Sequence, residues 1–130
     1  MTLVDTHVVL WLALEPGRIS KRARAVIEQA RQRGHGLAIS DITLLEIATA
    51  ESKGRITLNS SLETFLSEIE ARFVVLPITS KVCVRAIGLP ANYPKDPADR
   101  LIAATAIVEG SSLVTADEAI RSSRALPTIW

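Results

Sequence analysis

The chain contains few of the residues used by thiol- and imidazole-based sites. Its 130 residues include one cysteine, Cys83, and two histidines, His7 and His35. A single cysteine excludes an intrachain disulfide and a cysteine-based zinc site, and two histidines are too few for the usual zinc ligand sets. Because Cys83 stands in an apolar run, we expect it to be a core residue.

Several common site motifs are also missing. Neither a GxxxxGK phosphate loop nor a GxGxxG dinucleotide fingerprint occurs, and there is no GxSxG nucleophile elbow. No apolar run approaches the ~18 residues of a membrane-spanning helix, and Asp5 interrupts the first apolar segment early. We therefore expect no signal peptide, no membrane association and a cytoplasmic location.

The composition is that of one globular domain over residues 1–130. Hydrophobic residues make up 48% of the chain and charged residues 22%, which is enough apolar side chain for a sizeable core. The net charge of +1 neither requires nor excludes nucleic acid as a partner, because a local basic rim can suffice. The mean hydropathy of +0.25 is high for a small domain and predicts some apolar surface in a partner interface.

Strand and helix patterns alternate along the whole chain. This alternation predicts an α/β layer sandwich around a mostly parallel sheet, with no internal repeat. The expected strands are 2–4, 37–39, 73–78, 111–115 and 126–130. The expected helices lie near 8–14, 20–33, 42–53, 62–69, 82–87 and 97–109, with a short one around residue 120.

One helix start stands out, at residues 95–106. Pro97 suits the first helical position, which places Asp96 at the N-cap and Asp99 three residues later. The apolar, small residues that follow predict a buried, closely packed helix. Both carboxylates could serve only as caps, or Asp99 could belong to a reaction centre.

Three further acidic residues follow predicted strands. Asp5 comes directly after the first strand and Asp117 just after the fourth, while Glu46 lies within the helix after the second. Each has a structural alternative: Asp5 and Asp117 could be N-caps, and Glu46 could lie on an exposed helix face. In a parallel sheet, residues that follow the strands collect at one edge, so these acids and Asp99 can converge.

Four close carboxylates repel one another and require a cation. Oxygen ligands of this kind suit Mg²⁺ or Mn²⁺, which retain waters and leave room for phosphate oxygens. This chemistry points to hydrolysis of a phosphodiester bond. A separate basic stretch, residues 18–33, has six Lys or Arg side chains against Glu28 alone; a solvated helix face is the favoured interpretation, and a nucleic-acid or partner patch is the alternative.

Several motifs together resemble the PIN domain, and most closely the VapC-like toxins of bacterial toxin–antitoxin pairs. The resemblance runs through essentially the whole chain to Trp130 and is most specific in its last two motifs. The motifs are residues 5–7 (DTH), 10–12 (LWL), 40–48 (SDITLLEIA), 96–106 (DPADRLIAATA) and 113–117 (LVTAD).

The resemblance implies a three-layer α/β/α sandwich and a Mg²⁺- or Mn²⁺-dependent endoribonuclease, usually dimeric. It also implies a small antitoxin protein that covers the acidic pocket. The family's acidic residues map onto Asp5, Glu46, Asp99 and Asp117, with Asp5 and Asp99 as core metal ligands and the other two completing the site. Thr6 and Thr115 would position water or phosphate, and Asp96 would be a cap.

Two departures from the family pattern could alter which RNA fits. Asp41 stands where relatives often carry a neutral residue or proline, and residues 92–95 stand where many relatives have a histidine. Two alternatives to the nuclease are a PIN-fold binding module that cuts nothing and a phospho-acceptor receiver domain. The complete acidic set weighs against the first, and the isolated Asp5 with no lysine after Lys95 weighs against the second.

Overall fold

The computed structural model describes residues 1–34 and 36–130 as alternating helices and strands. The expected helix end at residues 34–36 includes His35, which lies outside the described residues. The strands are β1 (Thr2–Val4), β2 (Leu37–Ser40), β3 (Val74–Leu76), β4 (Leu113–Val114) and β5 (Thr128–Ile129). The helices are α1 (Thr6–Leu14), the short 3₁₀ helix η1 (Pro16–Arg18), α2 (Lys21–Gln32), α3 (Ile42–Ser52), α4 (Leu62–Arg72), α5 (Ser80–Ile87), α6 (Pro97–Val108) and α7 (Glu118–Ser123).

All described strand pairs are parallel, in the order β3-β2-β1-β4-β5. The chain builds outward from β1 to β3 on one side and then returns to place β4 and β5 on the other. The strand order therefore reverses between β1 and β4. In open parallel sheets this switch point leaves a crevice at the carboxyl ends of the strands, where ligands bind.

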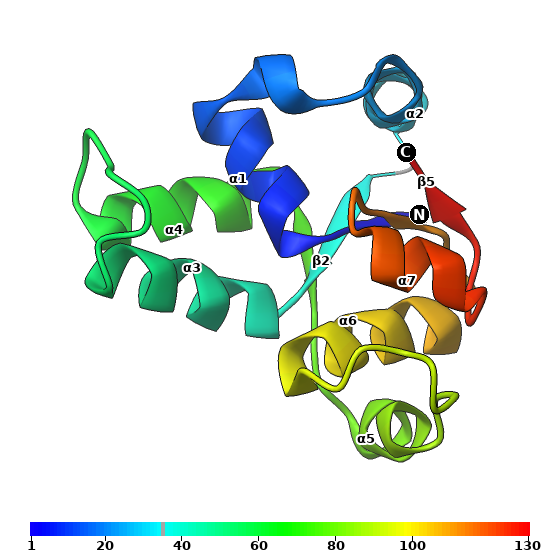
Figure 1. The fold of residues 1–130 in the computed structure, drawn as a ribbon. Coiled ribbons are helices and arrows are strands. Elements are labelled where there is room, and N and C mark those ends of the chain that lie inside the picture. Colours follow the sequence, from blue (N-terminus) through cyan, green and yellow to red (C-terminus); the bar gives the residue numbers. More distant parts are fainter. Residues whose placement is uncertain (35) are drawn as a thin grey trace.

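Alternation along the strands divides the core between the two faces of the sheet. Val4 and Val114 belong to the cluster that packs under α1, α2, α3 and α4. Their neighbours Leu3 and Leu113 belong to the cluster under α6 and α7. Figure 1 shows α1 and α2 on one side of the strands and α6 on the other, with α5 outside α6. The fold is thus the expected α/β/α sandwich.

Helix starts follow the capping residues that the sequence contains. The side chains of Ser20, Ser61 and Thr79 each accept a hydrogen bond from the backbone N–H three residues later. Asp96 does the same for α6, accepting from the N–H groups of Ala98 and Asp99 at 2.8 and 3.2 Å. These bonds are local in sequence, so the starts could be predicted within a residue or two.

The prediction that Cys83 is a core residue is wrong, because its side chain is exposed. Helix α5 forms an outer layer and buries a single stripe, Val82 and Ala86, against α6. Cys83 is the next residue along, about 100° around the helix axis. Val84 and Ile87 are also exposed, at 74% and 85%, so α5 presents an apolar outer face.

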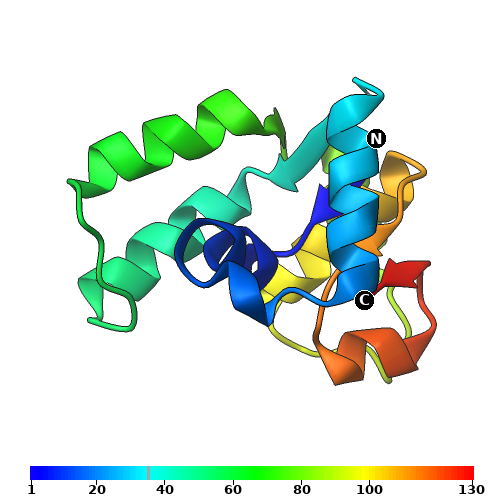
Figure 2. The same ribbon diagram turned by 90° about the horizontal axis from the view of Figure 1, so that it is seen from above.

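Three predicted strands are shorter than expected, and one of them, 126–130, is reduced to Thr128–Ile129. The predicted strand 73–78 is reduced to Val74–Leu76 because Phe73 ends α4 and β3 is the sheet's outer strand. Strand β4 contains only Leu113–Val114. No helix among the described residues combines the length and apolarity needed to cross a membrane. Figure 2 shows the two termini near α2, on the side of the molecule away from α3 and α4.

Candidate active site

The strand register brings Asp5 and Thr115 together at the switch point. Val4 pairs with Val114, so the next residues of β1 and β4 lie level at the carboxyl edge of the sheet. The N–H of Asp5 donates to the carbonyl of Val114 at 3.0 Å, which continues the ladder by one bond. The Thr115 hydroxyl then donates to Asp5 Oδ2 at 2.8 Å across 110 residues of sequence.

Asp5 is held by hydrogen bonds to both carboxylate oxygens. Its Oδ1 accepts from the N–H of Thr6 at 2.8 Å, and as the N-cap it begins α1. The side chain is 4% exposed. Burial raises the pKa of Asp5, against the lowering effects of the Thr115 hydroxyl, nearby His7 and the Thr6 N–H. The cap and site interpretations of Asp5 are therefore compatible.

Glu46 is oriented by a chain of two hydroxyl groups. The Thr6 hydroxyl donates to Glu46 Oε1 at 2.6 Å and lies 3.0 Å from the Thr43 hydroxyl. A threonine hydroxyl has one proton, so with Glu46 ionised the Thr43 hydroxyl must donate to Thr6. Burial raises the pKa of Glu46, and the charges of Asp5 and Asp96 raise it further.

Asp99 is repelled by four neighbouring carboxylates. It is half-buried at the third position of α6. Burial is the largest cause that raises the pKa of Asp99 to about 7, followed by the charges of Asp5, Asp96, Glu46 and Asp117. Within residues 1–34 and 36–130, no donor bonds its carboxylate. The Tyr93 hydroxyl fixes only the Asp99 backbone, donating to its carbonyl at 3.0 Å.

Asp117 lies at the exposed margin of this cluster. It is the N-cap of α7, and its Oδ1 accepts from the N–H of Ile120 at 2.9 Å. The Thr115 hydroxyl oxygen accepts from the Asp117 N–H at 3.1 Å while donating to Asp5. Thr115 therefore couples the two acidic segments, and Asp117 is near enough to raise the pKa of Asp5 and Asp99.

The acidic side chains do not form a closed metal cage. In the part of the chain that the structure describes, no three Asp, Glu, His or Cys side chains are placed to hold one ion together. The donor set is nonetheless all carboxylate oxygen, and three of its members have raised pKa values. These features suit a hard cation that is held by one or two carboxylates and several waters. The predicted ligand roles stay predictions.

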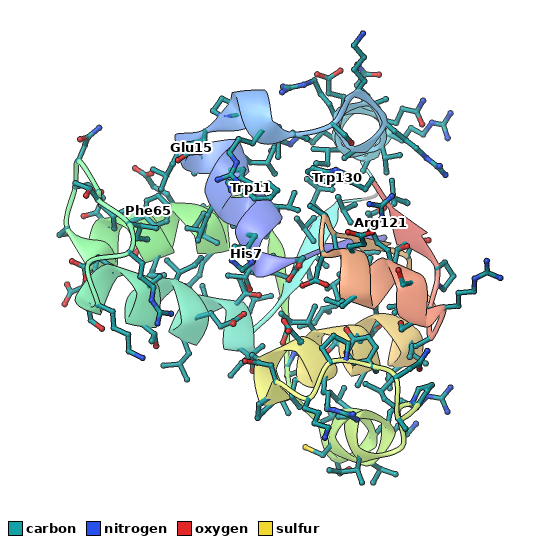
Figure 3. All side chains as sticks on the ribbon, in the orientation of Figure 1. His7, Trp11, Glu15, Phe65, Arg121 and Trp130 are labelled. Carbon is teal, nitrogen blue, oxygen red and sulfur yellow. The ribbon has the colours of Figure 1, made fainter. Side chains whose placement is uncertain are left out.

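Two hollows flank Glu46. A hollow of about 280 Å³ lies between α1 and α3, and its lining includes Thr6, His7, Trp11 and Arg55. A hollow of about 380 Å³ lies between α3 and the start of α6. Figure 3 shows His7 at the start of α1 and Trp11 further along the same helix; their ring centres are 6.2 Å apart. Glu46 can therefore be reached from two sides of α3.

Sequence reasoning missed three contributors to this site. Thr43 was not singled out, although a hydroxyl three residues before a glutamate on the same helix face is a usable signal. His7 directly follows the Asp5-Thr6 pair and lowers the pKa of Asp5 and Glu46. Tyr93 gave no local signal, because its bond to Asp99 depends on how the 89–95 loop folds back.

Asp41, one of the two departures from the family pattern, makes a hydrogen bond within the protein. Its Oδ2 accepts from the N–H of Ile78 at 3.3 Å, while its buried Oδ1 has no partner among the described residues. Asp41 is the residue before α3 but its side chain does not cap that helix. It thus ties the start of α3 to the segment after β3.

Comparison with known proteins agrees with this geometry. The family model described as "PIN domain" matches residues 2–125. The ribonuclease VapC22 of Mycobacterium tuberculosis (strain ATCC 25618 / H37Rv) is 39% identical over 122 residues, covering 94% of this chain and 91% of that protein.

Solved structures of similar shape have much lower sequence identity. The crystal structure of VapBC2 from Rickettsia felis, bound to a DNA fragment from their promoter, aligns with a TM-score of 0.74 at 19% identity, covering 98% of this chain and 96% of that chain. A toxin–antitoxin complex from Klebsiella pneumoniae aligns with a TM-score of 0.61 at 21% identity, covering 90% and 87%. At these identities the likeness concerns the fold, whereas the family match and the VapC22 relative cover nearly the whole sequence: the chain belongs to the PIN domain family.

Proposed function

We propose that this protein is a metal-dependent endoribonuclease that acts as the toxin of a toxin–antitoxin pair. The observation that carries the proposal is the group of buried and half-buried carboxylates at the switch point, where Asp5, Glu46 and Asp99 all have raised pKa values. Repulsion of this kind is relieved by a cation. The relationship to ribonuclease VapC22 supports RNA as the substrate.

Asp5 and Asp99 are the residues we expect to bind the cation, Mg²⁺ or Mn²⁺, with Glu46 and Asp117 completing the site directly or through water. Mg²⁺ usually takes one or two carboxylates and keeps several waters, which agrees with the open arrangement of these side chains. When bound, the cation would polarise the phosphate, supply an activated water and stabilise the leaving oxygen.

The neighbouring hydroxyl groups maintain the orientation of the carboxylates. The Thr115 hydroxyl donates to Asp5 Oδ2 and the Thr6 hydroxyl donates to Glu46 Oε1, so each of these carboxylates has a fixed hydroxyl donor. Outer-shell bonds of this kind orient metal ligands and tune their basicity. We therefore assign Thr6 and Thr115 to carboxylate orientation in addition to the positioning of water or phosphate.

A protein antitoxin and a second copy of this chain are the partners that we propose. The toxin–antitoxin complexes of similar fold support the first. The exposed apolar residues, which include Val84 and Ile87 on α5, leave surface for such contacts. A PIN-fold module without activity is not favoured, because each predicted carboxylate is present and the relative with 39% identity is a ribonuclease.

Cleavage of total cellular RNA by the purified, antitoxin-free protein tests the proposal. We expect a few discrete cuts with Mg²⁺ or Mn²⁺, none with EDTA and none with Asp99→Asn. Asp96→Asn is the matched control, since it changes a neighbouring carboxylate that caps the same helix. No cuts under any condition, from a folded protein that still binds Mn²⁺, would favour the binding module instead.

A further inference from the structure

Arg55 is the one residue with a positive charge that lines both hollows beside Glu46. The hollow between α1 and α3 and the hollow between α3 and α6 share Glu46, Ala50 and Arg55. An RNA strand that occupies either hollow would therefore lie beside this guanidinium. The position matters because the rest of the edge is acidic and repels phosphate.

The backbone fixes the position of Arg55 at the end of α3. Gly54 adopts a left-handed φ of +70°, and its N–H donates to the carbonyl of Glu51 at 3.0 Å. The N–H of Arg55 donates to the carbonyl of Ala50 at 2.9 Å. These two bonds form a Schellman motif, which turns the chain back over the last turn of the helix. Arg55 is thereby returned to the helix end that carries Ala50, one turn after Glu46.

Other arginines near the site already have partners. Arg18 pairs with Glu15 at 3.3 Å and stacks 4.3 Å from the centre of the Trp11 ring. Arg100 donates to the carbonyls of Ala86 and Tyr93. Within residues 1–34 and 36–130, by contrast, no hydrogen bond or ion pair engages the exposed guanidinium of Arg55. Its donors are free for a ligand.

We propose that Arg55 binds a phosphate of the RNA strand next to the bond that is cut. The inference rests on the proposed ribonuclease function and adds the residue that positions its substrate. A guanidinium presents paired donors that match phosphate oxygens, and its charge offsets the repulsion between RNA and the carboxylates. Arg55 is thus a positioning residue for the substrate backbone, and it carries no base specificity.

The binding test uses protein that cannot cut. A fluorescein-labelled single-stranded RNA of mixed sequence is titrated in EDTA with Asp99→Asn, alone and combined with Arg55→Ala, Arg55→Lys or Arg31→Ala. We expect Arg55→Ala to raise Kd about tenfold and to lower the slope of log Kd against log salt by about 0.7, the loss of one phosphate contact to a single strand. Arg55→Lys should restore the slope because it retains the charge.

Arg31→Ala is the matched control, since Arg31 is exposed on α2 away from both hollows. It should change neither quantity, because the basic face of α2 is interpreted as solvated; an equal loss in Arg31→Ala would favour α2 as the RNA patch and overturn the special role of Arg55. In the active background, Arg55→Ala should raise KM with a smaller change in kcat. A structural role for Arg55 would instead lower the melting temperature and leave the salt slope unchanged, which would overturn the inference. RNA binding that is unchanged while binding to a protein partner weakens would overturn it as well.

Failure of the ribonuclease proposal is distinguishable from failure of this one. If the wild-type protein cuts RNA but Arg55→Ala has wild-type Kd, KM and salt slope, only the role of Arg55 falls. If the wild-type protein cuts no RNA, the ribonuclease proposal falls, and the titration in EDTA still decides whether Arg55 contacts RNA phosphate.

Discussion

Asp5 and Glu46 accept hydrogen bonds from neighbouring side chains, whereas the Asp99 carboxylate accepts none from the described residues. The first two lie on the side of the site built by β1 and α3, where three threonine hydroxyls converge. Asp99 lies on the opposite side, at the start of α6. Its pKa is raised to about 7, so its protonation responds to a cation and to pH near neutrality.

The two sides of the site therefore differ in how far the fold itself orients their carboxylates. The β1–α3 side is oriented before any ligand arrives, because its donors are part of the fold. On the α6 side, the Asp96 cap and the Tyr93 bond fix the backbone around Asp99, but no hydrogen bond from the described residues fixes its carboxylate. A cation would be expected to order the Asp99 side chain most. The following predictions test this asymmetry.

The largest effect is expected from loss of a proposed ligand. Asp5→Asn and Asp99→Asn should each reduce RNA cleavage by more than the ~10–100-fold typical of outer-shell partners. Both proteins should remain folded, since asparagine keeps the shape of each side chain. Rates measured on one RNA with Mn²⁺, beside circular dichroism, check this; full activity in both variants would contradict the site assignment.

A smaller loss of cleavage rate is expected when the β1–α3 side loses a hydrogen-bond donor. Thr115→Val preserves shape but removes the hydroxyl that bonds Asp5 and accepts from the Asp117 N–H. We expect a ~10–100-fold lower cleavage rate and a stability loss of about 1–3 kcal/mol. Thr105→Val is the control, because Thr105 is equally buried but bonds only a carbonyl within its own helix. Equal effects in the two variants would remove the special role of Thr115.

The pH dependence of stability tests the α6 side, where the Asp99 carboxylate accepts no hydrogen bond from the described residues. Without a divalent cation, the native state keeps the Asp99 proton up to about pH 7, whereas the unfolded state releases it near the usual aspartate pKa of 3.8. The free energy of unfolding should therefore fall as pH rises between these values, because the native state binds more protons. Burial raises the pKa of Asp5 and Glu46 too, so they act in the same direction.

Asp99→Asn should remove much of this fall, which we expect to be on the order of 1–2 kcal/mol after solvent screening. At pH 8 in EDTA the variant should melt about 3–6 °C above the wild type. Added Mn²⁺ should narrow or reverse the difference, because only the wild type gains the full stabilisation from binding. Thermal melts across pH provide the measurement, and a flat wild-type profile would contradict the role of Asp99.

The smallest effect is expected at the cap. Asp96→Asn should change the cleavage rate by less than the ~10-fold lower limit for outer-shell partners, since asparagine is as good an N-cap as aspartate. Asp96→Ala should lose about 1 kcal/mol of stability. If Asp96→Asn abolished cleavage with an unchanged melting temperature, Asp96 would have to be counted among the ligands.

Features that depend on neighbours along the chain could be predicted from the sequence alone. The caps at Ser20, Ser61 and Asp96 are hydrogen bonds between residues close in sequence, and Pro97 prefers the first helical position. The residue types were therefore sufficient to predict where these helices begin. Strand and helix alternation determined the fold class, and acids placed after strands indicated the functional edge. The motifs identified the family.

The contacts between the predicted residues depend on the three-dimensional packing of distant segments. The strand order, with its reversal between β1 and β4, places Thr115 on Asp5, and the packing of α1 on α3 places Thr6 on Glu46. The exposure of Cys83 likewise depends on α5 being an outer helix that buries one stripe. Register and layer are set by packing among distant segments, and no local pattern of residue types encodes them.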